Sequence, residues 1–242
     1  MSKKSNQGKN VGDEIVGARC HLAPQNNMNN KLSYKLHYRR RLPHIQPEGA
    51  TFFVTSRSAG SLPAEVVEKL MQERERIDRE LENIKNNKEG AERAYLESRR
   101  LFGKWDNELD KSATGVKYLT DPRIADMVAD SLHFRDGKVF DLIAYCVMPN
   151  QIHIVFTPLE ESKDKYYPLS KIMHSLKRHT ANEANLILGR TGSFWQHENY
   201  DHFVRDDAEF ERIVKYVLYN PVKANLVKDQ KDWKWTYCKY DM

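Results

Sequence analysis

Two apolar runs separated by a Pro-Asn break stand near the middle of the chain. Residues 139–147 and 152–157 are rich in β-branched and aromatic side chains, which favour extended structure. Pro149 and Asn150 interrupt the pattern between them. A third run of the same kind occupies residues 51–57. The pattern therefore predicts three strands, at residues 51–57, 139–147 and 152–157, and the last two follow each other directly in the chain.

Apolar residues spaced three and four apart predict helices elsewhere. Residues 121–132 carry one apolar stripe, which begins at an Asp-Pro pair suited to a helix start. Residues 169–188 predict a basic helix, and residues 207–219 carry another apolar stripe. Because Pro221 disfavours helical backbone at the residue before it, we expect this last helix to end at or before Asn220.

A long charged stretch, residues 64–110, exceeds the length of an ordinary globular helix. Its helical pattern is interrupted near residues 86–90, so we expect a helical hairpin or a protruding arm. The stretch contains no recognisable catalytic motif. We therefore interpret it as a solvated scaffold.

The N-terminal end differs in composition. Residues 1–33 are rich in Asn, Gln, Gly and Lys without apolar periodicity, which predicts a disordered or loosely attached arm. A basic stretch with interleaved aromatic residues follows at 35–41, and it fits a nucleic-acid contact as well as a solvated charge run. We expect residues 34–242 to form a single domain, with residues 64–110 as an insertion within it.

The predicted order is strand, helix, strand, strand, helix, then a further strand and helix. Such an order favours an α+β fold in which an antiparallel sheet has its helices packed on one face. No repeat or low-complexity linker divides the chain. The charged helical insertion is an addition to this sheet.

Composition narrows the class of protein. The formal net charge is +5 and the pI is near 8.9, a bias toward polyanionic partners. The cysteines, Cys20, Cys146 and Cys238, are too widely spaced for a disulfide framework or a Cys-x-x-Cys zinc site. The start of the chain lacks an apolar signal region, and no run reaches the length of a membrane span. We therefore expect a cytoplasmic protein with no membrane partner.

Two metal-capable side chains open the third predicted strand. Gln151 and His153 are two residues apart, so they share one face of the strand while Ile152 points to the other. Imidazole is the commonest metal ligand among protein side chains. The same alternation also fits two polar residues on the solvated face of a sheet whose other face is the core. The strand pattern leaves both interpretations open.

Tyr216 and Asn220 are four residues apart on the last predicted helix, at the edge of its apolar stripe. The phenol is a candidate nucleophile, and the amide carbonyl is a candidate ligand for Mg²⁺ or Mn²⁺. A tyrosine at such an edge also fits amphipathic packing with its hydroxyl in water. Neither residue decides between these interpretations by itself.

Four motifs in order resemble those of a known family: residues 149–153 (PNQIH), 192–196 (GSFWQ), 201–205 (DHFVR) and 216–224 (YVLYNPVKA). The set resembles the REP-associated tyrosine transposases, relatives of the single-tyrosine HUH transposases of bacterial insertion sequences. The likeness spans roughly residues 44–240, apart from much of the charged insertion. It implies a ferredoxin-like sheet and a divalent-metal site that cleaves single-stranded DNA beside a hairpin.

The resemblance also implies roles for individual residues. Tyr216 would be the nucleophile that forms a 5′-phosphotyrosine and frees a 3′ hydroxyl, and His153 and Asn220 would bind the metal. The family's first HUH histidine falls on Gln151, whose carbonyl oxygen still suits Mg²⁺ or Mn²⁺. We therefore expect Gln151, His153 and Asn220 to hold the ion together with water and phosphate.

Further side chains suit contacts with DNA. Cationic groups bind phosphates, an indole stacks on an unpaired base, and an amide reads a base edge. Each has a structural alternative, which is a solvated helix face for the cations and a core position for the indole. The candidate DNA-binding residues are Arg57, Lys177, Arg178, Arg205, Trp195 and Gln196.

Three functions are compatible with these features. The first is a metal-dependent strand transferase that cleaves and rejoins single-stranded or hairpin DNA, such as REP-like palindromes, as a monomer or homodimer. The second is a catalytically silenced hairpin-DNA-binding protein derived from such a transposase, which the substitution at Gln151 suggests. The third is an RNA-binding protein with a ferredoxin-like sheet, which explains neither Tyr216 with Asn220 nor the ordered motifs.

Overall fold

The computed structural model describes residues 49–82, 87–111 and 115–240. The predicted arm at residues 1–33 and the basic stretch at 35–41 lie outside the described residues. Within the described part of the chain, no helix is both long enough and apolar enough to cross a membrane. The helices and strands are β1 (Phe52–Arg57), α1 (Ala64–Glu82), α2 (Asn87–Lys111), α3 (Pro122–Arg135), β2 (Phe140–Val147), β3 (Gln151–Pro158), β4 (Glu160–Ser162), β5 (Lys165–Tyr166), α4 (Leu169–Ile187), β6 (Tyr200–Phe203), α5 (Asp207–Lys223) and β7 (Thr236–Cys238).

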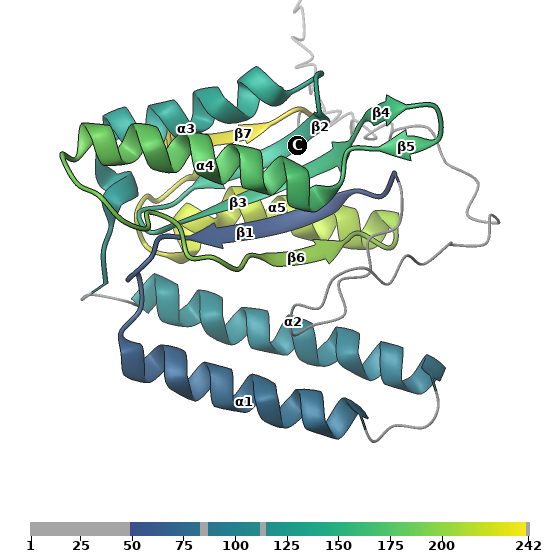
Figure 1. Cartoon of the computed structure of the whole chain (residues 1–242). Helices are drawn as coiled ribbons and strands as arrows, with labels where there is room; N and C mark the ends of the chain where they lie inside the picture. The colour runs from purple at the N-terminus through teal and green to yellow at the C-terminus, as the bar shows by residue number, and fades with distance from the viewer. Residues whose placement is uncertain (1–48, 83–86, 112–114, 241–242) are drawn as a thin grey trace, which may run out of the picture.

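The main sheet contains five strands in the order β6-β1-β3-β2-β7 (Figure 1). All of its strand pairs are antiparallel. α3 lies between β1 and β2 in the chain, and α4 lies between β3 and β6. The strands β6, β1, β3 and β2 therefore follow the ferredoxin-like arrangement, and β7 extends the sheet beyond β2. The predicted α+β class with an antiparallel sheet is confirmed.

The two faces of the sheet pack against different helices. Ile152 and Ile154 of β3 join a core with residues of α3 and α4. Val155, which points the opposite way, joins a second core with Val217 and Leu218 of α5. The prediction that all helices lie on one face is therefore wrong with respect to α5. The central strands are apolar on both sides, so each side needs its own cover.

α5 continues past Asn220 and ends at Lys223. The prediction that it ends at or before Asn220 is wrong. Pro221 lacks the amide hydrogen that would bond to the carbonyl of Val217, but the helix tolerates one missing bond close to its C-terminal end. Asn220 therefore stays in helical register with Tyr216.

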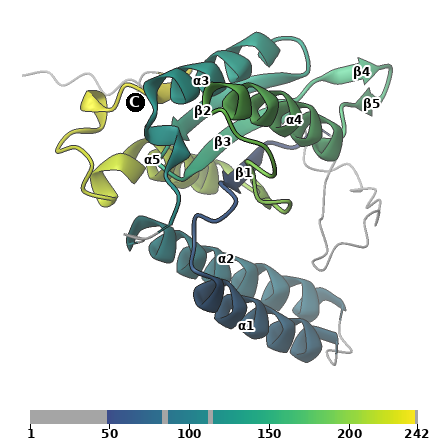
Figure 2. The same ribbon diagram turned by 60° about the vertical axis from the view of Figure 1, so that its left-hand side comes forward.

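The charged insertion forms two helices that lie side by side, with α2 nearer the sheet and α1 beyond it (Figures 1 and 2). α1 ends at Glu82 and α2 begins at Asn87, so residues 87–90, where the interruption was expected, are helical. Glu73 of α1 links the two helices through Lys104 at 2.6 Å and Arg100 at 3.0 Å. The expected helical hairpin is thus held in part by ion pairs.

Candidate functional site

The start of β3 places Gln151 and His153 on the sheet face that α5 and α2 cover. Both side chains are fully buried, which excludes the solvated sheet face considered above. Thr55 of β1 lies opposite His153 in the strand pairing. Its hydroxyl Oγ1 is 2.8 Å from His153 Nδ1. That contact occupies one ring nitrogen and leaves Nε2 facing into the site.

α5 brings Tyr216 and Asn220 to the same place. The two residues occupy successive turns of one helix. The rings of Tyr216 and His153 have centroids 5.6 Å apart and planes inclined by 75°. Asn220 is fully buried, and the Tyr216 hydroxyl lies against it, out of contact with solvent. The structure therefore brings the predicted nucleophile and the predicted metal ligands together.

The charged insertion adds a carboxylate that the sequence did not predict. Asp106 of α2 is 2% exposed, and its Oδ1 accepts a hydrogen bond from Gln151 Nε2 at 3.3 Å. The same oxygen is 3.6 Å from His153 Nε2. The other oxygen, Oδ2, forms an ion pair with Lys223 of α5. The interpretation of the insertion as a solvated scaffold is therefore wrong, because α2 reaches into the cluster.

Aromatic rings enclose these polar groups. The ring of Phe53 lies 5.9 Å from the rings of both His153 and Tyr216, measured between centroids. Phe102, one turn before Asp106 on α2, lies 5.9 Å from the Tyr216 ring. Tyr200 of β6 stacks on Phe102 at 4.2 Å. Because this apolar wall excludes water, charges inside it interact more strongly than they would at the surface.

Burial determines the protonation states of the cluster. It lowers the pKa of His153 to about 4 although Asp106 acts in the opposite direction, so the imidazole is neutral at pH 7. Burial alone would raise the pKa of Asp106, but His153, Lys223 and Tyr216 together lower it, and the carboxylate is ionised. Burial, and then the charge of Asp106, raises the pKa of Tyr216 far above its usual value. The phenol therefore keeps its proton.

Several buried atoms of the cluster have no hydrogen-bond partner. They are His153 Nε2, Gln151 Oε1 and Asn220 Oδ1, while the Tyr216 hydroxyl lies close to the Asp106 carboxylate and the Asn220 amide. Unpaired buried polar atoms cost free energy, so their grouping indicates a place for a ligand. Among the described residues no three His, Cys, Asp or Glu side chains form a metal cluster. A metal here therefore depends on amide oxygens, and one ring nitrogen with several oxygens fits Mg²⁺ or Mn²⁺.

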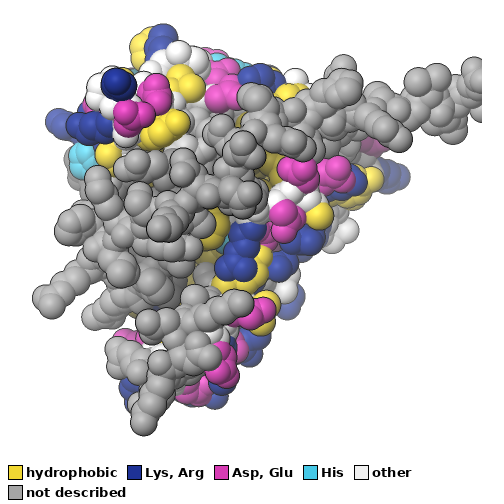
Figure 3. All heavy atoms as spheres, turned by 90° about the vertical axis from the view of Figure 1, so that its right-hand side faces the viewer, with side chains coloured by type: hydrophobic (Ala, Val, Ile, Leu, Met, Phe, Trp, Pro, Cys, Tyr) yellow, Lys and Arg dark blue, Asp and Glu magenta, His cyan; other side chains and the backbone are white. Residues whose placement is uncertain are grey.

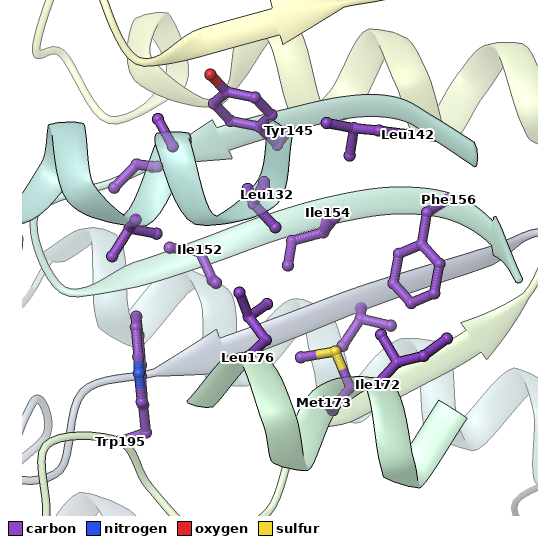
Figure 4. Close-up of a cluster of buried hydrophobic side chains, with 14 of the residues drawn as sticks. Leu132, Leu142, Tyr145, Ile152, Ile154, Phe156, Ile172, Met173, Leu176 and Trp195 are labelled. Carbon is purple, nitrogen blue, oxygen red and sulfur yellow. The ribbon is translucent and has the colours of Figure 1, made fainter. Parts of the chain in front are cut away.

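Trp195 is a core residue. It is 5% exposed, and its Nε1 donates a hydrogen bond to Thr180 Oγ1 at 2.8 Å. Figure 4 shows the indole within a cluster of apolar side chains that includes Ile152 and Leu176. The prediction that Trp195 stacks on an unpaired base is wrong, because neither face of the ring is open to solvent.

Lys177 holds the chain segment that precedes β6. Its Nζ donates hydrogen bonds to the carbonyl oxygen of His197 at 3.0 Å and to Asn199 Oδ1 at 2.8 Å. A phosphate would have to displace these acceptors. The structure therefore gives Lys177 a structural role, and the DNA contact at Lys177 stays a prediction.

The other candidate DNA contacts stay predictions. Arg178 is exposed on α4, and the partly exposed Gln196 donates its backbone amide to the carbonyl of Arg57 at 2.8 Å. The guanidinium of Arg57 lies 4.9 Å from the centre of the Trp105 ring, and burial lowers its pKa to about 10. The guanidinium of Arg205 lies 3.2 Å from the centre of the Tyr95 ring of α2. Two of the four therefore already contact the insertion.

Cationic and acidic side chains intermix on the described part of the face seen in Figure 3. Exposed ion pairs occur elsewhere too, such as Lys234 with Asp126 at 2.8 Å. The net charge of +5 therefore does not by itself mark a DNA-binding surface on the described residues.

Sequence reasoning missed the contributions of α2. Phe102, Asp106 and Asp110 recur every four residues, on a side of the helix close to that of the buried Leu109. Acidic residues that share the buried side of an amphipathic helix are unusual, because such a helix normally turns its charges to water. That spacing is the signal from which Asp106 could have been predicted as a buried group with partners.

Comparisons with known proteins give two curated relatives. One is a provisionally named REP-associated tyrosine transposase of Haemophilus influenzae, 29% identical over 103 residues, which are 40% of this chain and 58% of that protein. The other is the REP-associated tyrosine transposase of Escherichia coli K12, 27% identical over 96 residues, which are 40% of this chain and 53% of that protein. The chain thus matches a little over half the length of each relative.

No protein-family model matches the chain. A solved structure of a REP-associated tyrosine transposase bound to a REP hairpin aligns with a TM-score of 0.45 and 18% identity, over 83% of this chain and 81% of that one. This score is too low to establish a common fold.

Proposed function

We propose that this chain, which is related to the REP-associated tyrosine transposases, cleaves and rejoins single-stranded or hairpin DNA through Tyr216. The observation that carries the proposal is the position of the Tyr216 hydroxyl in a buried cluster with His153, Gln151 and Asn220. The cluster combines a nucleophile with unpartnered atoms of the kind that bind a divalent cation.

In the proposed cleavage, Tyr216 Oη attacks the phosphorus of a phosphodiester. The Oη–P bond forms and the P–O3′ bond breaks, while the phenolic proton passes to water and the leaving oxygen takes up a proton to become a 3′ hydroxyl. The 5′-phosphotyrosine retains an ester bond, so a 3′ hydroxyl can attack it and release Tyr216. Rejoining therefore needs no further energy source.

His153, Asn220 and the carbonyl of Gln151 are the proposed holders of Mg²⁺ or Mn²⁺ beside the phenol. A bound ion of this kind polarises the phosphate and stabilises the developing charge on its oxygens. Thr55 fixes the orientation of the His153 ring. Lys223 adds a positive charge near the Tyr216 ring, at 5.5 Å from its centre, where it favours both a phosphate and a developing phenolate.

The proposed reaction includes a movement of the Phe102 side chain of α2. The Tyr216 hydroxyl is buried, and the Phe102 ring packs against the Tyr216 ring. A phosphorus atom has to come within about 3–3.5 Å of the nucleophile before it can react. DNA therefore reaches Tyr216 only after the Phe102 ring has moved off the Tyr216 ring, a change that leaves Asp106 in the cluster.

A second candidate function is hairpin-DNA binding without cleavage. It is favoured by the amide of Gln151, which donates to Asp106 where the related transposases are expected to carry a metal-binding histidine. The closed cover over Tyr216 favours the same candidate. This protein would bind the hairpin through its surface cations and leave it intact.

One assay distinguishes the two candidate functions. Labelled hairpin DNA is incubated with the protein and Mn²⁺, and then run on denaturing and native gels. We expect a covalent band with the wild-type chain, none with Tyr216→Phe, and native-gel binding with both. Tyr219→Phe is the matched control, because Tyr219 is 58% exposed on the same helix. Binding without a covalent band in the wild type supports the silenced protein, and an equal band from Tyr216→Phe removes Tyr216 from the role.

A further inference from the structure

Asp106 is the carboxylate of the cluster, and its two oxygens have separate contacts. Oδ1 faces Gln151 Nε2 at 3.3 Å and His153 Nε2 at 3.6 Å. Oδ2 faces the ammonium of Lys223. The side chain is 1% exposed, so it is enclosed by the cluster rather than by solvent. A buried carboxylate is stable only when nearby groups compensate its charge. An aspartate that merely supported the fold would not need to be buried in this way.

Gln151 orients this carboxylate. Its Nε2 donates to Asp106 Oδ1, while its Oε1 has no hydrogen-bond partner. A glutamine at this position can therefore hold a neighbouring carboxylate in place by donating an amide hydrogen. The substitution at residue 151 and the carboxylate at residue 106 are chemically complementary.

We propose that Asp106 is the metal-binding group that takes over from the histidine absent at residue 151, and that Gln151 positions it. The inference rests on the proposed function, since it concerns the same site. It assigns the charged insertion a direct part in the chemistry. The protein ligands are then Asp106, His153 and Asn220, and Gln151, named above among the holders of the ion, acts through Asp106 instead.

The spacing of the atoms supports this assignment. Metal–ligand bonds of about 2.1 Å in an octahedral site place adjacent ligand atoms about 3.0 Å apart and opposite ones about 4.2 Å apart. The separation of 3.6 Å between Asp106 Oδ1 and His153 Nε2 exceeds the adjacent value by about 0.6 Å, so a small shift of the two side chains would let both atoms bind one ion. His153 Nε2 and Asn220 Oδ1, both unpartnered and buried, lie in the same cluster.

The chemistry of the donors supports it as well. Mg²⁺ and Mn²⁺ prefer carboxylate oxygens, whose full charge attracts a hard cation more strongly than the dipole of an amide does. Lys223 lies between two carboxylates, those of Asp106 and, at 3.0 Å, Asp110. Two carboxylates around one ammonium give the site a negative balance that favours a cation.

Mn²⁺ titration by calorimetry on the full chain tests the inference. We expect Asp106→Asn to weaken Mn²⁺ binding at least about tenfold, a loss of the size that follows damage to a metal site. Gln151→His added to Asp106→Asn should recover binding, because it restores the missing nitrogen ligand. Glu108→Gln is the matched control on the same helix, since the side chain of Glu108 is 41% exposed and pairs with Lys111 at 4.0 Å, and we expect its affinity to stay near that of the wild type.

Asp106→Glu tests whether weaker Mn²⁺ binding by Asp106→Asn reflects the lost carboxylate or only a distortion of the site. It keeps a carboxylate, so we expect it to bind Mn²⁺ more tightly than Asp106→Asn. If Asp106→Asn matches the wild type, or if the Glu and Asn variants are equally weak, the role of Asp106 is overturned and the proposed function stands. If the wild-type chain binds no Mn²⁺, with or without hairpin DNA, the metal-dependent function is overturned as well.

Discussion

Lys223 of α5 and Asp106 of α2 form an ion pair that ties the charged insertion to the helix carrying Tyr216. The pair is asymmetric, because the side chain of Lys223 is 40% exposed and that of Asp106 only 1%. The buried carboxylate depends on the partly exposed ammonium for its compensation. The ion pair therefore helps to hold α2, and with it Asp106, against the site.

Lys223→Met should destabilise the protein. We expect the free energy of unfolding to fall by about 1–3 kcal/mol, because the variant leaves Asp106 buried beside fewer compensating groups. Urea unfolding at pH 7 measures the change. Lys215→Met is the control, since Lys215 pairs with Glu211 at 3.7 Å on the exposed side of the same helix, and its loss should stay below about 1 kcal/mol. Equal losses in the two variants would contradict the dependence of Asp106 on Lys223.

Phe102→Ala should make Tyr216 easier to reach. The variant removes the ring that packs against the tyrosine, so we expect faster formation of the covalent band in the hairpin assay. It should also lower the free energy of unfolding by about 1–3 kcal/mol, less than a fully buried phenylalanine would. The rate of band formation over time is the decisive measurement.

Leu96→Ala is the matched control for this change. Leu96 lies on α2 but is 55% exposed, so its truncation should alter neither the stability nor the rate appreciably. A Phe102→Ala protein that forms the band no faster than the wild type would show that the Phe102 ring does not limit access to Tyr216.

Trp195→Phe should affect stability rather than DNA binding. The variant leaves the Thr180 hydroxyl without its donor, and we expect a loss of about 1–2 kcal/mol in the free energy of unfolding. Thr180→Val removes the other partner, so the double variant should cost less than the sum of the single ones. Hairpin affinity, measured on folded protein, should stay within about twofold of the wild type. A large fall in affinity would restore Trp195 as a candidate DNA contact.

The sheet was largely predictable because its patterns are local. The apolar runs that predict β1, β2 and β3 depend on strand propensity, and α5 shows its stripe in consecutive turns. The side of the sheet on which α5 lies was not predictable, since both faces of the central strands are apolar. The continuation of α5 through Pro221 was also not predictable, because the packing of the helix outweighs the one hydrogen bond that Pro221 cannot make.

The candidate site was also predictable only where its residues are close together in the sequence. Gln151 with His153, and Tyr216 with Asn220, are short-range pairs whose periodicity reveals a shared face. Asp106 is far from them in the chain, and its contacts with Gln151 and Lys223 arise only when the insertion folds back on the sheet. Trp195 shows the converse error, since its aromatic character fits base stacking and core packing equally well until burial is known.

The ion pairs of Glu73 should make the helical hairpin sensitive to acid. A hydrogen bond from Lys104, together with the charges of Lys104 and Arg100, lowers the pKa of Glu73 below its ordinary 4.5. A lowered pKa in the folded state contributes stability that is complete above pH 4.5 and is lost as the pH falls through the lowered value. Glu73→Gln should therefore reduce the free energy of unfolding at pH 7, by less than about 1 kcal/mol because all three side chains are partly exposed.

Urea unfolding of both proteins at pH 7 and at several values below pH 4.5 tests this prediction. The difference between the wild type and Glu73→Gln should shrink steadily with acid, since protonation removes from the wild type the charge that the variant already lacks. High salt at pH 7 should reduce the same difference by screening. Glu68→Gln is the control on the same helix, because Glu68 is exposed and accepts from the uncharged Gln72 at 3.3 Å. A difference that stays constant with pH would mean that packing of the Glu73 side chain, rather than its charge, holds α1 to α2.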